Sequence, residues 1–435
     1  MLALNILVIM DPPNIILIVL DTLRKDILPI YGGNANTPNL NELSRDAVVF
    51  PNPIAPSPWT LPSHMSIFTG LYAVEHKVHE DPDNGIDKSL KLQYEFKDKT
   101  IAKILKKEGY TNIGFSANGW ISESSVFSDN FDYFQFQHSA YFTKKDLDLA
   151  RNFLKIKLTQ VISNPNLFKD LYRLYRFEKF NGWPLKKGGN HILQNILNSS
   201  YFTPFFLFIN FMEMHDPYTY YELRHGYYED LVGIKPFPDR IIKKMRVNYL
   251  KEAKIVDEYI GELIKFLKNI KQYDNSLIII TSDHGQALKE KNYLWHGLFL
   301  YNELIEVPLI IKFPMGKKIR ISNGYQSLVN LKELIENAVN GNYVDITGEK
   351  AFSEAWGFQL KVGENIKKKD NNNYGIPRKA IYKNGYKLVI NIEGEIEEFS
   401  YKNKKIDPRE KSDVVNELKD ELYIFKGKEN FNVFK

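Results

Sequence analysis

The stretch Asn14-Ile-Ile-Leu-Ile-Val-Leu20, followed directly by Asp21, decides the fold. Its six consecutive aliphatic residues leave no polar face, which is typical of a strand that is buried on both sides in a parallel sheet. Ligands of such sheets bind at the carboxyl ends of the strands. Asp21 therefore stands where a functional carboxylate is expected.

Further apolar runs repeat this pattern along the chain, at residues 112–116, 204–211, 276–282 and 307–313. Helices are expected between them: one capped by Thr37, one from Thr100 to Gly109, and a long one in which Ala253, Val256 and Ile260 recur at helical spacing. The alternation of strands and helices predicts a doubly wound α/β core with a mostly parallel sheet flanked by helices.

The last quarter of the chain has a different sequence pattern. Residues 363–374 are polar and low in complexity, which predicts an exposed loop, and Asn384-Gly385 between two apolar segments predicts a β-hairpin. A second turn at Glu393-Gly394 and a helix from Asp413 to Phe425 complete a small antiparallel sheet with a helix. We therefore expect an α/β catalytic domain at residues 1–321 and a smaller α+β subdomain at 322–435, packed on it.

Composition excludes several classes of protein. Hydrophobic residues make up 43% and charged residues 26% of the 435 residues, which excludes global disorder. The chain has no cysteine, so disulfides, thiolate metal sites and cysteine nucleophiles are excluded. The net charge of +5 is too small to predict a nucleic-acid partner.

The positive charge is concentrated in an aromatic insert at about residues 140–192. Between Lys144 and His191, eleven Lys or Arg stand against four acidic residues, a balance of +7 that leaves −2 for the rest of the chain. This pattern predicts a lid over a polyanionic or glycan substrate, or a surface that docks on lipid headgroups. A helical hairpin with a solvated basic face would give the same pattern.

The first ten residues are apolar, but they have neither a basic start nor a small-residue cleavage site. They are also far shorter than the roughly 20 residues that span a bilayer. We therefore expect a cytoplasmic protein with no integral membrane segment, and a truncated export signal is the alternative. The sequence does not indicate an oligomeric state.

The stretch from Ser57 to His64 places a hydroxyl at the start of a helix. Thr60 precedes Pro62 and an apolar pattern, which predicts that Thr60 is the N-cap. Unpaired N–H groups and the helix dipole favour an anion there, so a nucleophilic threonine would suit this position. An ordinary capping threonine is the alternative.

Potential metal ligands follow two of the other buried runs. Asp283-His284-Gly285 comes after residues 276–282, and His215-Asp216-Pro217-Tyr218 comes after residues 204–211. His296 lies a dozen residues beyond Asp283. Carboxylate and imidazole ligands together suit Zn, Mn or Fe, and Ca or Mg less typically. Each motif alone would also fit an ordinary turn, but parallel strands would gather them at one edge.

Taken in order, these motifs resemble the sulfatase family of the alkaline phosphatase superfamily. The resemblance rests on five segments, which are residues 14–26, Thr37-Pro-Asn-Leu40, Pro58 to Gly70, His215 to Tyr218 and Thr281 to Gly285. His296 to Tyr301, Val307 to Ile311, Tyr386-Lys-Leu388 and Asp407 to Glu410 extend it over nearly the whole chain. It implies an alkaline phosphatase-like fold.

The resemblance also implies a divalent metal ion held by Asp21, Asp283 and His284, with Thr60 as nucleophile and possible fourth ligand. Sulfatases proper carry at this position a Cys or Ser that is converted to formylglycine, followed by Arg four residues on; this chain has Thr60 and His64. Threonine instead resembles the phosphatases, phosphodiesterases and phosphoglycerol transferases of the superfamily, which use the hydroxyl directly.

The remaining polar residues receive roles by the same resemblance. His64 would replace the arginine, while His215 and His296 would contact the anion or protonate the leaving oxygen. Candidate substrate contacts are Arg24, Asp216, Lys289 and Lys291. Asp216, His215 and His296 could also hold a second metal ion. Because Thr22 stands where many sulfatases have a second Asp, we expect one metal site, with Ca, Mn, Zn and Mg all open.

We therefore expect a metal-dependent, sulfatase-like hydrolase of sulfate or phosphate esters that acts through Thr60. Its substrate would be a small-molecule, lipid or glycan anionic ester. A phospho-substituent transferase or phosphodiesterase acting on a lipid, nucleotide or glycan is one alternative. An inactive sulfatase-like binding protein is another.

Overall fold

The computed structural model describes residues 11–80, 86–137, 187–219, 221–222, 230, 236–357 and 375–425. The first ten residues, most of the basic insert and the predicted loop at 363–374 lie outside these ranges. The strands of the main sheet are β1 (Asn14–Leu20), β2 (Val48–Val49), β4 (Thr111–Ser116), β5 (Tyr133–Phe136), β6 (Phe205–Phe211), β7 (Ser276–Thr281) and β10 (Leu309–Lys312). The longer helices of the main body are α1 (Pro38–Asp46), α2 (Thr60–Thr69), α5 (Ile101–Lys107), α9 (Gly189–Asn198), α12 (Asp239–Asn269) and α14 (Leu331–Val339).

The central sheet has seven strands in the order β2-β10-β7-β1-β6-β4-β5. Strand β1 lies in the middle and pairs in parallel with β6 and β7, and β4 pairs in parallel with β5 and β6. Only β10 and β2 at one edge run antiparallel. The predicted doubly wound, mostly parallel α/β sheet is confirmed.

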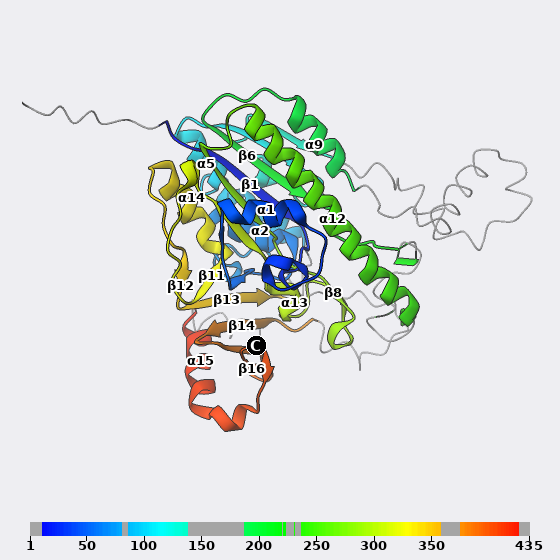
Figure 1. Cartoon of the computed structure of the whole chain (residues 1–435). Helices are drawn as coiled ribbons and strands as arrows, with labels where there is room; N and C mark the ends of the chain where they lie inside the picture. The colour runs from blue at the N-terminus through cyan, green and yellow to red at the C-terminus, as the bar shows by residue number, and fades with distance from the viewer. Residues whose placement is uncertain are drawn as a thin grey trace, which may run out of the picture.

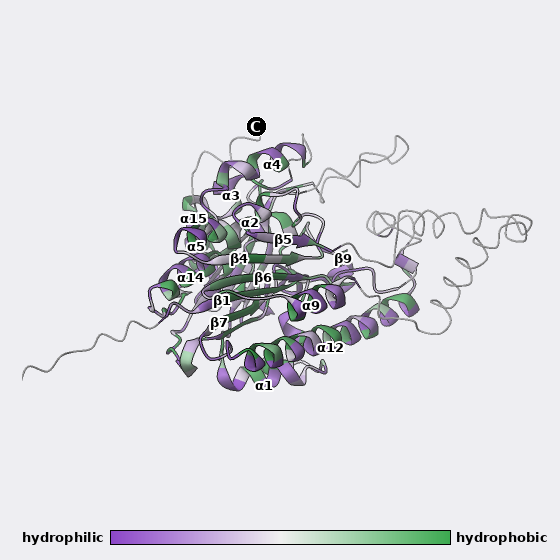
Figure 2. Cartoon of the chain, turned by 90° about the horizontal axis from the view of Figure 1, so that it is seen from above, coloured by the Kyte–Doolittle hydropathy of each residue, from purple (hydrophilic) through white to green (hydrophobic). Residues whose placement is uncertain are grey.

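Helices cover both faces of this sheet (Figures 1 and 2). Alternate residues of β1 point to opposite faces, as strand geometry requires. Ile15, Leu17 and Val19 join one hydrophobic cluster, whereas Ile16 and Ile18 join the other. The first cluster contains α2, α5 and α14, and the second contains α1, α9 and α12. This burial on both sides explains the continuous apolar run of the sequence.

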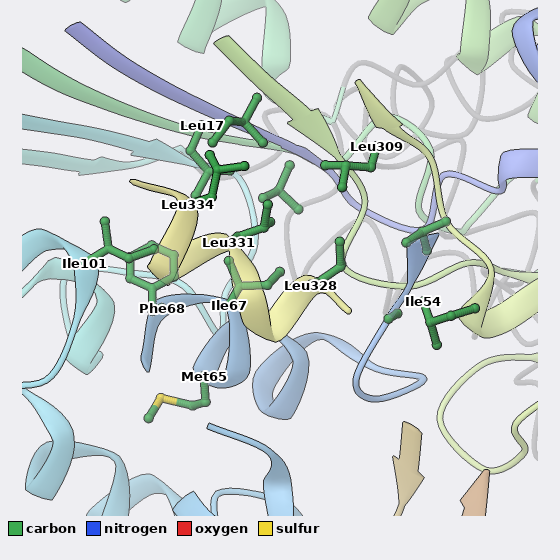
Figure 3. Packing of buried hydrophobic residues seen from close by; sticks show 14 of the residues in the cluster. Leu17, Ile54, Met65, Ile67, Phe68, Ile101, Leu309, Leu328, Leu331 and Leu334 are labelled. Atoms are coloured by element: carbon green, nitrogen blue, oxygen red, sulfur yellow. The ribbon is translucent and has the colours of Figure 1, made fainter. Parts of the chain in front are cut away.

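Figure 3 shows how α2 packs in the first hydrophobic cluster. Its Ile67 and Phe68 lie next to Leu331 and Leu334 of α14, and Ile101 of α5 closes the group. All ten residues of α2 are buried. The helix that carries Thr60 is therefore held rigidly by the core.

The C-terminal part forms a separate five-stranded antiparallel sheet with a helix, as predicted. Its elements are β13 (Lys350–Ala355), β14 (Arg378–Lys383), β15 (Tyr386–Asn391), β16 (Ile396–Tyr401), β17 (Lys404–Lys405) and α15 (Ser412–Ile424). Asn384-Gly385 joins β14 to β15 with both residues at positive φ, as a two-residue hairpin requires. Val74 of the main body lies in the hydrophobic core of this sheet.

Packing crosses the predicted domain boundary at residues 321/322. Strand β11 (Tyr325–Ser327) pairs with β3 (Pro53–Ile54) and with β12 (Thr347–Gly348), and α14 belongs to the core of the main body. The described residues also form three short helices, α3 (Ala73–His76), α4 (Asp87–Leu92) and α13 (Asn302–Ile305), and a two-stranded ribbon of β8 (Ala287–Leu288) and β9 (Leu294–Trp295). None of the described helices is long and apolar enough to cross a membrane.

Candidate active site

Four neighbouring parallel strands bring polar residues to one edge of the sheet. Asp21 follows β1, Asn118 follows β4, His215 follows β6, and Asp283 with His284 follows β7. Because β7, β1, β6 and β4 are adjacent in the sheet, their carboxyl ends form a continuous rim. The structure therefore gathers residues that lie more than 200 positions apart in the sequence.

Thr60 is the first residue of α2, and Trp59 is the N-cap. The prediction that Thr60 itself caps the helix was therefore wrong by one residue. Its hydroxyl does not bond to the backbone of its own helix but points to the rim of the sheet. Oγ1 lies 3.3 Å from Nε2 of His284 and accepts a hydrogen bond of 3.4 Å from the Asn118 amide. Thr60 is only 3% exposed.

Asp21, Asp283 and His284 form a compact group in which one potential ligand atom from each lies within 4.8 Å of the others. Nε2 of His284 is 3.9 Å from Oδ1 of Asp21 and 3.4 Å from Oδ2 of Asp283. Both of these carboxylate oxygens are buried and have no hydrogen-bond donor among the described residues. Nδ1 of His284 donates to the Gly285 carbonyl at 2.9 Å, which leaves the lone pair on Nε2.

This donor set fits a divalent metal ion. Two buried carboxylate oxygens that have no proton donor within the described ranges lie close to one imidazole lone pair, and oxygen and nitrogen donors of this kind bind Zn or Mn. Without a cation, ionising both buried carboxylates of this group is electrostatically unfavourable. Burial, followed by repulsion from Asp283, raises the pKa of Asp21 to about 6, and burial raises the pKa of Asp283 to about 7. A bound cation would remove this cost by stabilising both carboxylates.

Hydrogen bonds from the backbone fix the orientation of Asp283. Its Oδ1 accepts from the N–H groups of His284 at 2.9 Å and Thr22 at 3.3 Å, and its carbonyl accepts from the Ser63 hydroxyl at 2.7 Å. Thr22 has a φ of 62°, a left-handed conformation that is uncommon for a β-branched residue. This strained turn after β1 aims the Thr22 N–H at Asp283, as strained backbone often does at functional sites.

His64 contacts the backbone of Thr60 and the carboxylate of Asp283. Its Nδ1 donates to the Thr60 carbonyl at 3.0 Å and lies 3.4 Å from Oδ2 of Asp283. The ring is fully buried against Phe127 and Phe208, and burial lowers its pKa to about 3. A neutral, enclosed imidazole of this kind can position Asp283 and the first turn of α2.

His215, Asp216 and His296 form a second group of potential ligands, also within 4.8 Å of one another. The His296 ring lies 4.6 Å from the His284 ring and 5.0 Å from the His215 ring, so the two groups are contiguous. Burial lowers the pKa of His215, but the carboxylates of Asp216 and Asp21 outweigh burial and raise it overall. Burial lowers the pKa of His296 well below its usual value, and the neighbouring histidines add to this effect.

The three cationic side chains that the sequence predicts as substrate contacts all form ion pairs with carboxylates. Arg24 bonds to Asp26 at 2.7 and 2.9 Å and to Glu290 at 2.8 Å. Lys289 pairs with Asp230 at 2.6 Å. Lys291 pairs with Glu398 at 2.8 Å. The structure therefore brings Thr60 and the predicted metal ligands together, but it holds these three side chains in other ion pairs.

Sequence reasoning missed three residues at the rim. The Asn118 amide donates to Oδ2 of Asp21 at 2.7 Å as well as to Thr60, and its position just after a buried strand was an available signal. Oε1 of Gln286 accepts from Nδ1 of His296 at 2.6 Å. Nζ of Lys187 donates to the carbonyl oxygens of Glu213 and His215, and so holds the turn after β6. No sequence pattern pointed to Gln286 or Lys187.

Residues 13–335 match the family model described as Sulfatase. The chain belongs to the sulfatase family. This sulfatase-family chain is 24% identical to the uncharacterized sulfatase YidJ of Escherichia coli over 455 residues, which cover 94% of this chain and 84% of that protein. It is also 24% identical over 480 residues to an N-acetylglucosamine-6-O-sulfatase of Bacteroides thetaiotaomicron, with 92% and 82% covered.

Solved structures agree with this assignment at the level of the fold. The phosphonate monoester hydrolase SpPMH from Silicibacter pomeroyi superimposes with a TM-score of 0.66 at 17% identity, and 94% of each chain is covered. The family match and the named relatives together make this sulfatase-family chain an ester hydrolase.

Proposed function

We propose that this chain hydrolyses sulfate or phosphate esters through the Thr60 hydroxyl, with a divalent metal ion held by Asp21, Asp283 and His284. The observation that carries the proposal is the 3.3 Å approach of Thr60 Oγ1 to His284 Nε2, next to two buried carboxylate oxygens that lack a donor among the described residues. The hydroxyl proposed as nucleophile and three potential metal ligands thus lie close together.

A divalent ion in this position supplies positive charge that favours the alkoxide over the hydroxyl and neutralises an ester oxygen. Neighbouring groups of the chain orient the Thr60 hydroxyl for this role. The Asn118 amide donates to Oγ1 and so helps to fix the direction of the Thr60 side chain. The N-terminal end of α2 adds a favourable dipole for negative charge on Thr60.

The reaction we propose has two steps. Oγ1 of Thr60 loses its proton to solvent and forms a bond to the phosphorus or sulfur atom while the bond to the leaving oxygen breaks, and the leaving oxygen takes up a proton. Water then cleaves the covalent Thr60 ester and restores the hydroxyl. The product is sulfate from a sulfate ester, inorganic phosphate from a phosphate monoester, or a phosphate monoester from a diester. His215 and His296 border the same volume, and the raised pKa of His215 suits donation of the proton.

Two features support direct use of the hydroxyl. The chain has no cysteine, and the residue at the start of α2 is a threonine whose side chain already faces the ligand group.

The relatives named above act, by their names, on a 6-O-sulfated amino sugar and on phosphonate monoesters. We carry over from them only the general substrate class, an anionic ester on a small molecule, lipid or glycan.

The test combines metal analysis with three chromogenic esters, which are an aryl sulfate, an aryl phosphate monoester and an aryl phosphate diester. Protein stripped of metal and reloaded with Ca, Mn, Zn or Mg should turn over at least one ester only after reloading. Asp283→Asn should lower kcat/KM by at least about 1,000-fold, which corresponds to about 4 kcal/mol of transition-state stabilisation. Asp274→Asn, which changes an exposed carboxylate just before the same strand, is the matched control.

Full turnover by stripped protein would contradict the metal assignment. An alternative outcome is release of the aryl alcohol without free sulfate or phosphate, together with an adduct on added glycerol. That result would show a transferase in place of a hydrolase.

A further inference from the structure

Trp120 is a large aromatic residue that stays exposed beside the candidate active site. The loop after β4 carries it, two residues beyond Asn118. Trp120 is 41% exposed, although Asn118 and Ile121 in the same loop are buried. Tryptophan is highly buried on average, and where it lies at a surface it is enriched in binding interfaces. The Trp120 ring is therefore a candidate contact for a ligand.

Two chains of contacts place Trp120 next to Thr60. The Trp120 N–H donates to Oδ1 of Asn118 at 2.9 Å, and the side-chain amide of the same Asn118 donates to Oγ1 of Thr60 at 3.4 Å. The Trp120 ring also packs against the ring of Trp59, the residue directly before Thr60. Because two residues of chain span at most about 7 Å, the Trp120 backbone lies close to Asn118 and to the hydroxyl that it contacts.

The contact with Trp59 holds the Trp120 ring and leaves room beside it. The two ring centroids are 6.1 Å apart and the ring planes meet at 82°, so the pair is edge-on and not stacked. An edge-on pair leaves ring faces uncovered that a stacked pair would cover. Trp59 is only 6% exposed, so the accessible surface of the pair belongs mostly to Trp120. A Cβ added at the neighbouring Gly119 would meet no described atom within 4 Å, which shows open space next to the ring.

The cationic side chains near the rim do not offer the substrate a comparable contact. Arg24, Lys289 and Lys291 are each paired with carboxylates. An indole ring instead attracts the partly positive C–H groups of another ring through its negative π face. We propose that Trp120, held by Trp59, binds the ring of the alcohol from which the ester group is removed. Both a sugar ring and an aryl ring have the C–H groups that this contact needs.

This inference rests on the proposed function, because it assumes that Thr60 attacks the ester. With the ester group at Thr60, the attached alcohol would lie over the loop that carries Trp120. The contact makes Trp120 a specificity-determining residue, because it favours esters of ring alcohols over esters of short linear alcohols. It contributes to binding of the substrate and takes no part in bond breaking, so its loss should raise KM more than it lowers kcat.

The experiment compares three substrates that carry the same ester group, which are a pyranose 6-ester, an aryl ester and a glycerol ester. Trp120→Ala should lower kcat/KM at least about tenfold for one or both ring esters, mainly through KM, and less than about threefold for the glycerol ester. Trp120→Phe should restore most of the loss, because phenylalanine keeps an aromatic face. A loss for the pyranose ester alone assigns a sugar ring to Trp120, and a loss for the aryl ester alone assigns an aryl ring.

Phe202→Ala is the matched control. It removes another exposed aromatic ring, 73% exposed, which lies before β6 at the amino end of the sheet, and it should leave all three kcat/KM values unchanged. Unfolding curves confirm that each variant is folded. Wild-type kinetics in Trp120→Ala would overturn the proposal, and so would an equal loss for all three esters.

Binding of uncharged alcohols gives a readout that does not depend on turnover. Tryptophan fluorescence is followed while methyl glucopyranoside, phenol or glycerol is added to the wild type and to Trp120→Ala. We expect a saturable change with at least one ring alcohol in the wild type only. A change of equal size in Trp120→Ala would overturn the proposal. Failure of the Thr60 assignment would appear as full turnover by Thr60→Ala and would leave the fluorescence titrations unchanged, so the two failures are distinguishable.

Discussion

The hydroxyl of Thr60 lies 3.3 Å from Nε2 of His284, although the two residues are 224 positions apart. This contact joins the first turn of α2 to the loop that follows β7. Both residues are almost fully buried; Thr60 belongs to a helix that is packed in the core, and His284 lies in the loop just after a buried strand. The proposed nucleophile and the proposed metal ligands are thus positioned by packed parts of the fold, which is the arrangement that catalysis by orientation requires.

The first prediction concerns the dependence of stability on pH and metal. Burial raises the pKa of Asp21 to about 6 and that of Asp283 to about 7, well above the usual pKa of an aspartate. Between about pH 4 and pH 7, metal-free folded protein therefore binds more protons than unfolded protein, and its free energy of unfolding falls as the pH rises. Divalent metal binds the ionised carboxylates, so the gain in Tm on adding Mn²⁺ should be larger at pH 8 than at pH 5.

Differential scanning fluorimetry with Mn²⁺ or EDTA at both pH values checks this expectation. Asp283→Asn should abolish the difference between the two pH values. An equal gain in Tm at pH 5 and pH 8 would contradict the assignment of these carboxylates as ligands.

The second prediction concerns Asn118, whose amide donates to both Asp21 and Thr60. Asn118→Ala should lower kcat by about 10- to 100-fold, because Asp21 and the hydroxyl lose the donor that orients them. Asn195→Ala removes an amide that bonds only to Gln135 among the contacts described, and it should leave kcat unchanged. Steady-state kinetics measure kcat for both variants. An Asn118→Ala enzyme with wild-type kcat would show that the amide is not part of the catalytic arrangement.

The third prediction separates two roles for Arg24. Because its guanidinium is bound by Asp26 and Glu290, Arg24→Ala should destabilise the fold by about 1.5–3 kcal/mol through the loss of charged hydrogen bonds. The KM for an anionic ester should change less than threefold. Chemical denaturation and kinetics measure the two effects separately. A large rise in KM with unchanged stability would restore the substrate-binding role that the sequence predicts.

The fourth prediction concerns Gly285, whose backbone packs tightly against helix α13. A Cβ at this position would lie 2.0 Å from the Glu303 carbonyl oxygen. Gly285→Ala should therefore displace the adjacent His284, weaken metal binding at least tenfold and destabilise the protein by about 1–3 kcal/mol. Gly119→Ala has no atom within 4 Å of the added Cβ and should be neutral for stability. Metal titration and thermal unfolding test both variants.

Much of the fold and the first ligand group could be predicted from local patterns. The aliphatic run before Asp21 specifies a strand that is buried on both faces, and parallel strands align their carboxyl ends, so Asp21 and Asp283 had to meet at one rim. The Asn384-Gly385 hairpin followed from turn chemistry alone. These features depend on interactions between residues that are close in sequence or on general rules of sheet topology.

Other features depend on contacts that no local pattern reveals. Glu290 pairs with Arg24 from 266 positions away, which turns a predicted substrate contact into a partly buried ion pair. Trp59 is the N-cap of α2, so the Thr60 side chain points to the rim of the sheet and does not cap the helix. Capping preferences do not resolve a difference of one residue in the position of a helix start. Asn118 was overlooked because an asparagine after a strand is common in turns.

The most direct test of the central claim compares Thr60→Ala with Thr69→Ala in the same helix. The Thr69 hydroxyl bonds to the Met65 carbonyl within α2, so its loss controls for a missing hydroxyl in this helix. With wild-type metal content verified for both proteins, Thr60→Ala should lower kcat/KM at least about 1,000-fold for the best ester, and Thr69→Ala should stay within about threefold of the wild type. Turnover by metal-loaded Thr60→Ala at the wild-type rate would contradict the assignment of Thr60 as the nucleophile.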